Sequence, residues 1–269
     1  MDPTRSGLSE AELASVAAAV GRDAEGLAAE LEKRPWAIHD LLSDPALVQS
    51  VLEPDDLNPC ESAFVFFAVM TRAVANDLLD RSFVHDWVGP SFRLPVFDVE
   101  PLQEFVAAPH RVLFIARLLT SMVRPADETI PAECADPLTL VGWLTSVEGD
   151  SRNALLRRIG DLSLYIAGVH ADAIGHVIVT PHAADHIGQT LGLDADETRA
   201  LCDPASPAPG LDALEIVGAR SYQEARRSGE ATPPIVSDVA ERMRAARRFL
   251  THLSDQFLAP PAPGLPSAA

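Results

Sequence analysis

The sequence of 269 residues is poor in cysteine and in aromatic residues. The three cysteines, Cys60, Cys134 and Cys202, are far apart and form no Cys-x-x-Cys pair. This pattern argues against a disulfide scaffold and indicates reduced thiols, as in a cytoplasmic protein. An aromatic content of 6%, together with Ala-rich stretches, favours closely packed helices over a β-sandwich.

The sequence is also poor in basic residues. Lys and Arg total 21 against 39 Asp and Glu, which gives a formal net charge of −18. Because such a chain repels phosphate groups and anionic lipid surfaces, we expect neither nucleic acid nor a membrane as a partner. We therefore interpret the segments that meet at Gly21 as a packed helix hairpin and not as a DNA-binding helix-turn-helix. No apolar run approaches the length that crosses a bilayer, and the first residues lack the apolar region of a signal peptide.

Several catalytic motifs are missing as well. The sequence contains no G-x-G-x-x-G, no Walker A loop, no G-x-S-x-G elbow and no Glu-x-x-His. These absences disfavour nucleotide binding, serine hydrolysis and a di-iron carboxylate bundle. Our first hypothesis is therefore a non-enzymatic interaction or regulatory protein that binds a protein partner.

The clearest positive signal is helical periodicity. Leu155, Ile159, Leu162 and Ile166 recur every three or four positions, which places them on one helical face. The sequence predicts an all-α fold, a multihelical and mainly antiparallel bundle with little or no strand. Its main helices are expected at residues 61–80, 109–123, 151–176, 211–227 and 235–258, with Phe64, Phe67 and Ile159 among the core residues. The stretch 87–97, which has turn residues at Gly89 and Pro90, is the only plausible strand region.

Capping residues, glycine and proline at the segment boundaries predict three parts. Residues 1–53 form a unit of short helices, in which Ser9 and Asp23 are expected N-caps and Gly21 ends the first helix. Residues 60–258 form the main helical domain. Residues 259–269, rich in Pro and Ala, form a disordered tail. Between the helices, 54–59 is read as a linker and 124–135 as a loop.

Half of the histidines gather in one region, and this provides the second hypothesis. His182 and His186 lie four residues apart on a helix that starts near Pro181, so their imidazoles project from one face and could share a metal ion. The string His-Ala-Ala-Asp-His is similar to an inverted zincin motif in which Asp185 replaces Glu. His176 and His170 are further candidate ligands. The alternative function is therefore a metal-dependent helical enzyme with zinc or iron. The purely structural interpretation is a set of surface histidines that bind no metal.

A third possibility is an apolar ligand held among Phe64, Phe67 and neighbouring helices.

Two further sets of polar residues stand out. Arg158, Asp161 and Tyr165 are spaced to meet along one side of a helix, and Arg220 and Tyr222 on a later helix are similar candidates. A surface ion pair with a tyrosine hydroxyl is the favoured interpretation, and catalysis is the alternative. The last helix carries a basic cluster, which we expect to be a solvated face paired with neighbouring carboxylates: Arg242, Arg244, Arg247 and Arg248.

The segment Gly160-Asp-Leu-Ser-Leu-Tyr-Ile-Ala-Gly168, followed by Gly218-Ala-Arg-Ser-Tyr222, resembles a group of uncharacterised bacterial helical proteins. That group carries a Gly-Asp-Leu-x-Leu-aromatic segment and a downstream Gly-x-x-x-Tyr-x-x-Ala. The resemblance spans about residues 60–228. The aromatic and proline residues of that group after Gly168 are replaced here by Val169, His170 and Ala171. The resemblance implies a shared helical fold and no catalytic residue that can be carried over.

Overall fold

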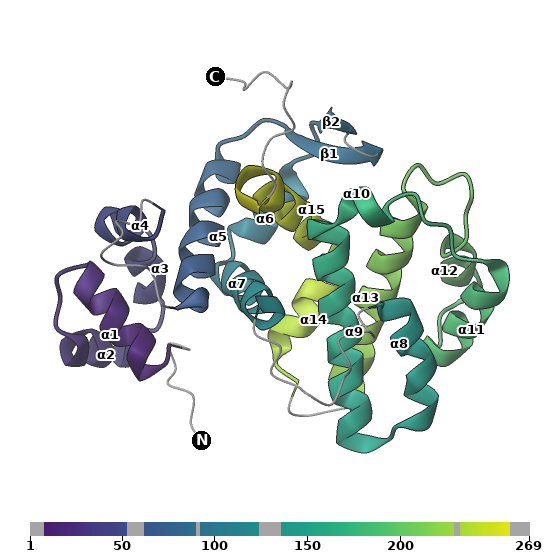
Figure 1. The fold of residues 1–269 in the computed structure, drawn as a ribbon, viewed down its shortest axis with the longest axis horizontal. Coiled ribbons are helices and arrows are strands. Elements are labelled where there is room, and N and C mark those ends of the chain that lie inside the picture. The colour runs from purple at the N-terminus through teal and green to yellow at the C-terminus, as the bar shows by residue number, and fades with distance from the viewer. Residues whose placement is uncertain (1–7, 53–61, 90–91, 124–135, 229–231, 259–269) are drawn as a thin grey trace. The chain divides into compact units, whose positions relative to one another are not determined.

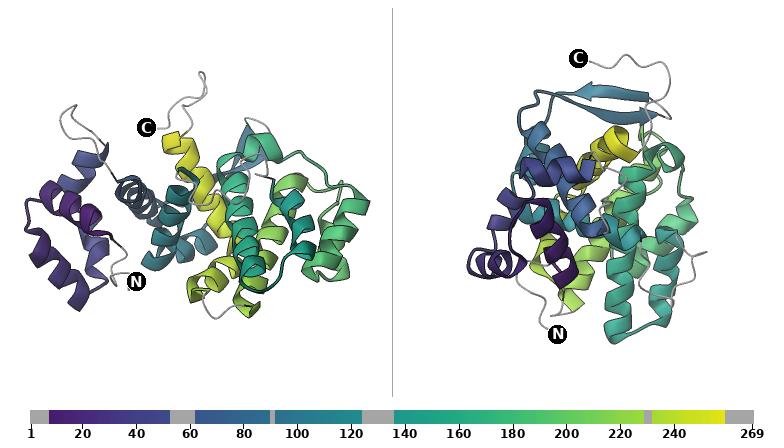
Figure 2. Two further views of the ribbon diagram at one scale, coloured as in Figure 1. Left: turned by 60° about the horizontal axis from the view of Figure 1, so that its bottom comes forward. Right: turned by 60° about the vertical axis from the view of Figure 1, so that its left-hand side comes forward.

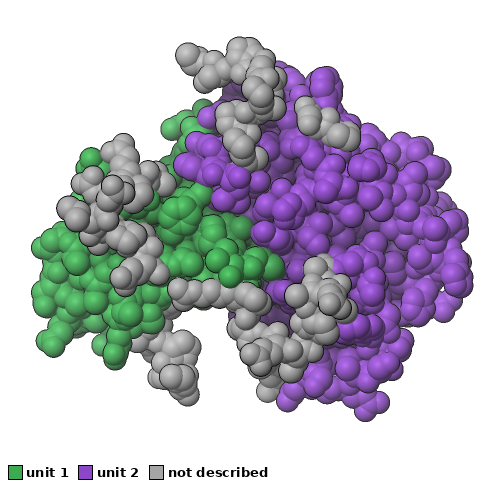
Figure 3. Space-filling model, in the orientation of Figure 1, with its two compact units in different colours: residues 1–80, 107–125 green, residues 81–106, 126–269 purple. Residues whose placement is uncertain are grey.

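The computed structural model describes residues 8–52, 62–89, 92–123, 136–228 and 232–258 (Figure 1). Over these residues the chain forms α-helices and one two-stranded antiparallel sheet, so the predicted all-α, multihelical fold class is confirmed. The expected linker, loop and tail lie outside the described residues. The chain divides into two compact units, residues 1–80 with 107–125 and residues 81–106 with 126–269 (Figure 3). The sequence-based division into a short-helix unit 1–53 and a main helical domain 60–258 stays a prediction.

The described residues of unit 1 form four short helices and two longer ones. They are α1 (Glu10–Ala19), α2 (Ala24–Lys33), α3 (Ala37–Leu41), α4 (Pro45–Leu52), α5 (Ala63–Leu79) and α7 (Pro109–Val123). The predicted caps are present: Ser9 forms a capping box with Glu12, and the Asp23 carboxylate accepts the Gly26 N–H. Gly21 has a φ of 64°, the left-handed conformation that favours glycine at a helix end.

The core of unit 1 lies where α5 and α7 pack together. The apolar first half of α5 is buried, including Phe64 and Phe67 as predicted, and the Arg117 guanidinium lies over the Phe64 ring at 5.7 Å. Arg72 of α5 donates to the Ser43 hydroxyl at 3.1 Å, which ties α5 to the connection before α4. Phe64 and Phe67 are therefore packing residues.

Unit 2 contains the remaining elements. They are β1 (Val84–Gly89), β2 (Phe92–Val96), α6 (Glu100–Val106), α8 (Pro137–Trp143), η1 (Leu144–Ser146), α9 (Gly149–Val169), α10 (Ala171–Ile174), α11 (Pro181–Leu191), α12 (Ala195–Ala200), α13 (Pro209–Ser228), α14 (Pro234–Glu241), α15 (Met243–Leu253) and η2 (Ser254–Leu258). Helices α9 and α13 run side by side at the centre of the unit (Figures 1 and 2). Three residues of the predicted face of α9, Leu155, Ile159 and Leu162, are 7% exposed or less, and the fourth, Ile166, is partly buried.

Glycines let α9 and α13 approach each other closely. A Cβ atom at position 160 would lie 2.4 Å from the Tyr222 ring, and one at position 218 would lie 2.8 Å from the Ser163 Cβ. Each glycine therefore provides the space that a side chain of the facing helix fills. The two segments that carry the resemblance to bacterial helical proteins thus meet at one helix seam, and packing accounts for their glycines.

Two predicted helices are shorter than expected. The helix predicted over 151–176 ends at Val169, and the helix predicted over 235–258 is broken at Arg242, where φ is −120° and ψ is 29°. Gly168 stands next to the end of α9, whereas no glycine or proline marks the break at Arg242. The break at Arg242 follows from tertiary packing, because α14 packs mainly on α13 whereas α15 packs on α9 and α6.

The strand region predicted over 87–97 is a hairpin that begins earlier. Strand β1 pairs antiparallel with β2 in a register that sets Val84 opposite Val96 and Asp86 opposite Leu94, with an irregularity between Trp87 and Gly89. The hairpin lies beside α15 in both views of the unit (Figures 1 and 2). Trp87 is buried in a cluster with side chains of α9, α10 and α13: Ala167, Ala171, Leu211 and Leu214.

Candidate functional site

The predicted histidine cluster lies on α10, α11 and their flanks. His182, Asp185 and His186 are exposed on α11, which begins after the N-cap Thr180 and ends at Gly192, where φ is 63°. His170 forms the end of α9 and its ring contacts the Tyr165 ring at 5.4 Å between centroids. His176 is exposed in the connection between α10 and α11.

Over the residues that the structure describes, no three His, Cys, Asp or Glu side chains are grouped so that they could hold a metal ion. His182 and His186 share one helix at the predicted spacing, but a pair is fewer than the three or four protein ligands of ordinary zinc sites. The metal-dependent enzyme therefore stays a prediction that rests on this pair alone.

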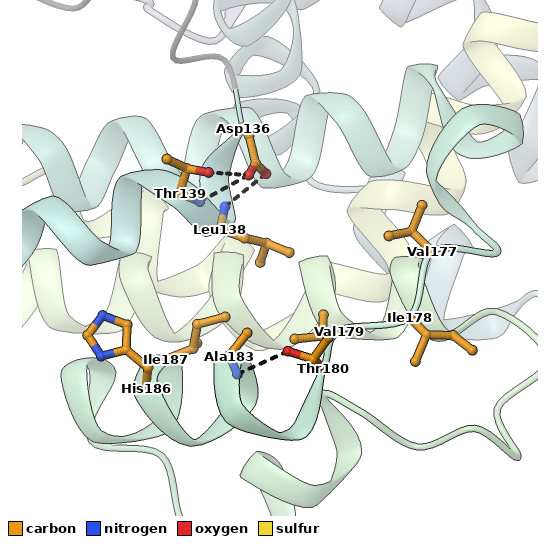
Figure 4. A pocket seen from close by; sticks show the side chains of 10 residues that line it. All are labelled: Asp136, Leu138, Thr139, Val177, Ile178, Val179, Thr180, Ala183, His186 and Ile187. Carbon is orange, nitrogen blue, oxygen red and sulfur yellow. Dashed lines mark hydrogen bonds between the residues drawn. The ribbon is translucent and has the colours of Figure 1, made fainter.

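A groove of about 310 Å³ runs between α8 and α11 (Figure 4). Its lining residues are Asp136, Leu138, Thr139, Val177, Ile178, Val179, Thr180, Ala183, His186 and Ile187. Asp136 and Thr180 use their side-chain oxygens to cap α8 and α11. His186 lies at one end of the groove and Ile178, which is 54% exposed, at the other. The walls offer apolar contact area, the His186 imidazole and the Thr139 hydroxyl, which donates to the Asp136 carboxylate at 2.6 Å.

Asp161 and Tyr222 meet across the seam of α9 and α13. The Tyr222 hydroxyl donates to the Asp161 carboxylate at 2.7 Å, and Tyr222 is fully buried. Burial raises the pKa of Asp161, and this effect outweighs the Tyr222 hydrogen bond and the charges of Arg157 and Arg158, which lower it. Burial and the Asp161 charge also raise the pKa of Tyr222 far above its ordinary value. A tyrosine held in its neutral form suits a structural hydrogen bond.

Arg158 lies near enough to Asp161 for its charge to lower the pKa of that carboxyl group, whereas Tyr165 contacts the ring of His170. Arg220 donates to the carbonyl oxygens of Leu191 and Gly192, so it caps the C-terminal end of α11. The structure thus brings Asp161 together with Tyr222 and places Arg220 in a structural role.

A buried ion network holds the hairpin to the helices of unit 2. Arg247 of α15 is 4% exposed and donates to both oxygens of Asp86, at 2.8 and 3.2 Å, and to Glu215 at 2.6 Å. Arg248 donates to Asp86 at 2.7 Å. Although burial alone would raise the pKa of Asp86, the hydrogen bond from Arg247 and the charges of both arginines lower it to about 2. Asp86 is therefore ionised at neutral pH and clamps β1 to α15.

A second clamp acts through the neighbouring pair of the hairpin. Trp87, which faces Arg93 across the strands, donates its indole N–H to Asp172 at 2.7 Å. Arg93 donates to Asp172 at 2.9 Å and to Asp255 at 3.1 Å. The hairpin is thus joined to α10 and to η2 as well as to α15. A two-stranded hairpin alone is marginally stable, and these clamps fix its position on unit 2.

The open end of this hairpin, where the chain enters β1 and leaves β2, carries exposed side chains. Alternate residues of a strand share one face, and the register sets His85 opposite Pro95 and continues to Phe83 opposite Phe97. The Phe83 ring contacts His85 at 5.5 Å and Phe97 at 5.8 Å between centroids. All four side chains are exposed, Phe97 by 72%. We call these four residues the aromatic face.

Sequence reasoning found part of this site. It singled out the basic cluster of the last helix, and the expected pairing with carboxylates is confirmed for Arg242, Arg244, Arg247 and Arg248. The expected solvation is wrong for Arg247, because Asp86 and Glu215 compensate its charge inside the unit. Asp86 was missed; the available signal was a lone carboxylate within an apolar strand.

Comparison with protein-family models, with curated proteins and with solved structures finds no match to this chain. No single helix among the described residues is long and apolar enough to cross a membrane, although α6 and α7 reach that length and composition when counted together.

Proposed function

We propose that this chain is a non-enzymatic, cytoplasmic interaction protein whose aromatic face binds a protein partner. The observation that carries the proposal is the contrast within one hairpin. Its Asp86 and Trp87 side chains are fixed by buried ion pairs and hydrogen bonds, whereas the Phe97 ring is 72% exposed and the Phe83 ring 37%. Phe92 and Leu94, also exposed, add apolar side chains nearer the turn of the same hairpin. Exposed aromatic groups are enriched at the centre of protein interfaces.

The clamps support binding because they fix the face in advance. A side chain or loop that becomes ordered on association costs free energy, and a hairpin already tied to α10, α15 and η2 avoids most of that cost. The ring contacts between Phe83 and its two neighbours hold the rings in place as well. The aromatic face is thus a prearranged surface.

The hairpin is suited to contact through side chains and not through strand addition. Pro95 of β2 has no backbone N–H, so β2 cannot offer a full row of donors to an added strand. The partner would therefore cover the rings and need not extend the sheet.

The cytoplasmic location is supported by composition. The three cysteines are scattered and odd in number, and the net charge of −18 keeps an exposed aromatic surface soluble. A regulatory role would follow from what the partner does.

The test is photo-crosslinking in native cell extract with the full chain. A photoreactive phenylalanine analogue replaces Phe97 in one sample and Ile178 in the matched control, since Ile178 is also exposed but lies at the α8–α11 groove. We expect one partner that is crosslinked from position 97 and not from position 178. Recovery of the chain alone, or of the same proteins from both positions, would contradict the proposal.

A further inference from the structure

We infer that the partner presents a basic residue, Lys or Arg, beside apolar side chains, and that this cation binds between Phe97 and Asp98. The inference rests on the proposed function and adds the chemistry of the partner. It is carried by the charges that surround the aromatic face.

Asp98 is an exposed carboxylate next to Phe97 in the chain. It follows Phe97 directly, in the turn in which the Val99 N–H donates to the Phe97 carbonyl at 3.0 Å. Its side chain is exposed and pairs with no described residue. Three other carboxylates near the hairpin already form ion pairs: Asp86, Asp172 and Asp255 all accept hydrogen bonds from arginines. Asp98 therefore has its charge available.

Glu100 adds a second exposed carboxylate three residues from Phe97. It lies in the first turn of α6, where the helix dipole already favours a negative charge. The helix dipole therefore accounts in part for an acidic residue at position 100, so the inference rests mainly on Asp98. Together they give the Phe97 end of the aromatic face a negative rim.

The pairing of ring and carboxylate defines what the face recognises. A cation within about 6 Å of a ring centroid is attracted by the ring quadrupole, and an adjacent carboxylate adds an ion pair to the same cation. Phe97 is 72% exposed, so its ring is accessible to an incoming side chain. His85, which contacts Phe83, borders the face on the other strand. Arg and Lys of a protein segment fit this arrangement, and flanking apolar residues would cover Phe83 and Pro95.

Charge also argues against two other occupants of the aromatic face, a second copy of the chain and a lipid surface. In a symmetric pair of copies, two Asp98 rims would face each other on chains that each carry −18, so a second copy is disfavoured. A lipid surface lacks the discrete cation that the rim selects, and anionic lipids would be repelled.

The experiment is selection of ligands from a random peptide display library with the purified full chain. We expect enriched peptides that place Arg or Lys next to aliphatic or aromatic residues. One enriched peptide is then synthesised, and its affinity is measured by fluorescence anisotropy at low and high salt. Its affinity should fall as salt rises, because exposed charges are screened.

Four variants of the full chain separate the contributions. Phe97→Ala should weaken binding by at least about tenfold, as expected for a central aromatic residue. Asp98→Asn should weaken it by roughly two- to fivefold and reduce its salt dependence. The matched controls Ile178→Ala and Asp185→Asn, exposed residues of the groove and of α11, should leave the affinity unchanged.

The outcomes distinguish the inference from the proposed function. Neutral or acidic peptides whose binding still depends on Phe97 would overturn the inference and leave the proposed function standing. Peptides that bind Phe97→Ala as well as the natural chain would overturn both. A Phe97-dependent dimer in solution, or Phe97-dependent binding to zwitterionic vesicles, would also overturn the inference, because the face would then take a second copy or lipid.

Discussion

Two carboxylates in unit 2, Asp86 in the hairpin clamp and Asp161 in the α9–α13 seam, differ in the direction of their pKa shifts. Burial raises the pKa of both side chains. At Asp86 two arginines reverse that effect and lower the pKa to about 2. At Asp161 the direct hydrogen-bond partner is the neutral hydroxyl of Tyr222, and the pKa stays raised.

The comparison shows that the protonation state of a buried carboxyl group depends on its hydrogen-bond partner as well as on how deeply it is buried. A guanidinium in direct contact keeps Asp86 ionised, so that region is held by charge and hydrogen bonds together. The region around Asp161 is held by the packing of the Tyr222 ring against Gly160 and by the hydrogen bond from the Tyr222 hydroxyl. We therefore expect the two regions to respond differently to substitution and to acid.

The largest effect is expected from Asp86→Ala. Removal of this carboxylate leaves Arg247 with Glu215 and takes the hydrogen bond from Arg248, so a nearly buried guanidinium loses half of its compensation. The free energy of unfolding should fall by about 3 kcal/mol, measured by urea denaturation. Asp98→Asn, an exposed carboxylate of the same region, is the control and should change stability by less than about 0.5 kcal/mol. Equal effects of the two variants would contradict the clamp.

A somewhat smaller loss is expected from Gly160→Ala in the packed region. The added methyl group would lie 2.4 Å from ring atoms of Tyr222, which cannot move without disturbing the α9–α13 seam. Overpacking of this kind costs about 1–3 kcal/mol. Gly142→Ala is the matched control, because its methyl group would meet the His186 Nε2 atom at 3.8 Å, an ordinary contact. Thermal denaturation of both variants measures the difference, and the melting temperature should fall in Gly160→Ala and not in Gly142→Ala. A lower melting temperature for Gly142→Ala alone would contradict the seam packing.

As the pH falls, Asp86 and Asp161 should change the stability of the fold in opposite directions. The pKa of Asp86 falls from 3.8 to about 2 on folding, so its contribution of about 2 kcal/mol is present above pH 4 and is lost as the pH falls toward 2. The pKa of Asp161 is raised on folding, so its ionised form costs stability, and that cost is relieved as the pH falls. Urea midpoints between pH 4 and 2 should lose acid sensitivity in Asp86→Asn, and urea midpoints above pH 4 should gain it in Asp161→Asn. Slopes that change in the same direction would contradict the assignment.

Helix positions were predictable because they depend on local signals. The apolar face of α9 at Leu155, Ile159 and Leu162 repeats at the helical period, and it is buried as predicted. Ser9 and Asp23 cap their helices because a short polar side chain reaches an unpaired N–H two or three residues ahead. The break at Arg242 was not predictable, since it depends on α14 and α15 packing against different helices.

The candidate site was less predictable because its residues are distant in sequence. Arg247 and Asp86 are 161 positions apart, and no spacing rule connects them. The histidines drew attention because they are close in sequence, yet His182 and His186 lie exposed on one helix, outside any group of three metal-binding side chains among the described residues. The aromatic face depends on the register of a hairpin that begins before the predicted strand region.

The smallest stability effect should come from Tyr222→Phe. This variant keeps the ring against Gly160 and removes only the hydroxyl that donates to Asp161. One net hydrogen bond is worth about 1 kcal/mol, and loss of it should also raise the pKa of Asp161 further. In Asp161→Asn the hydroxyl bonds a neutral group, so adding Tyr222→Phe to that variant should cost less than in the natural chain. A double-mutant cycle by urea denaturation measures this coupling. Additive effects would show that Tyr222 stabilises the seam through its ring alone, and the contrast with the charged clamp at Asp86 would then be sharper still.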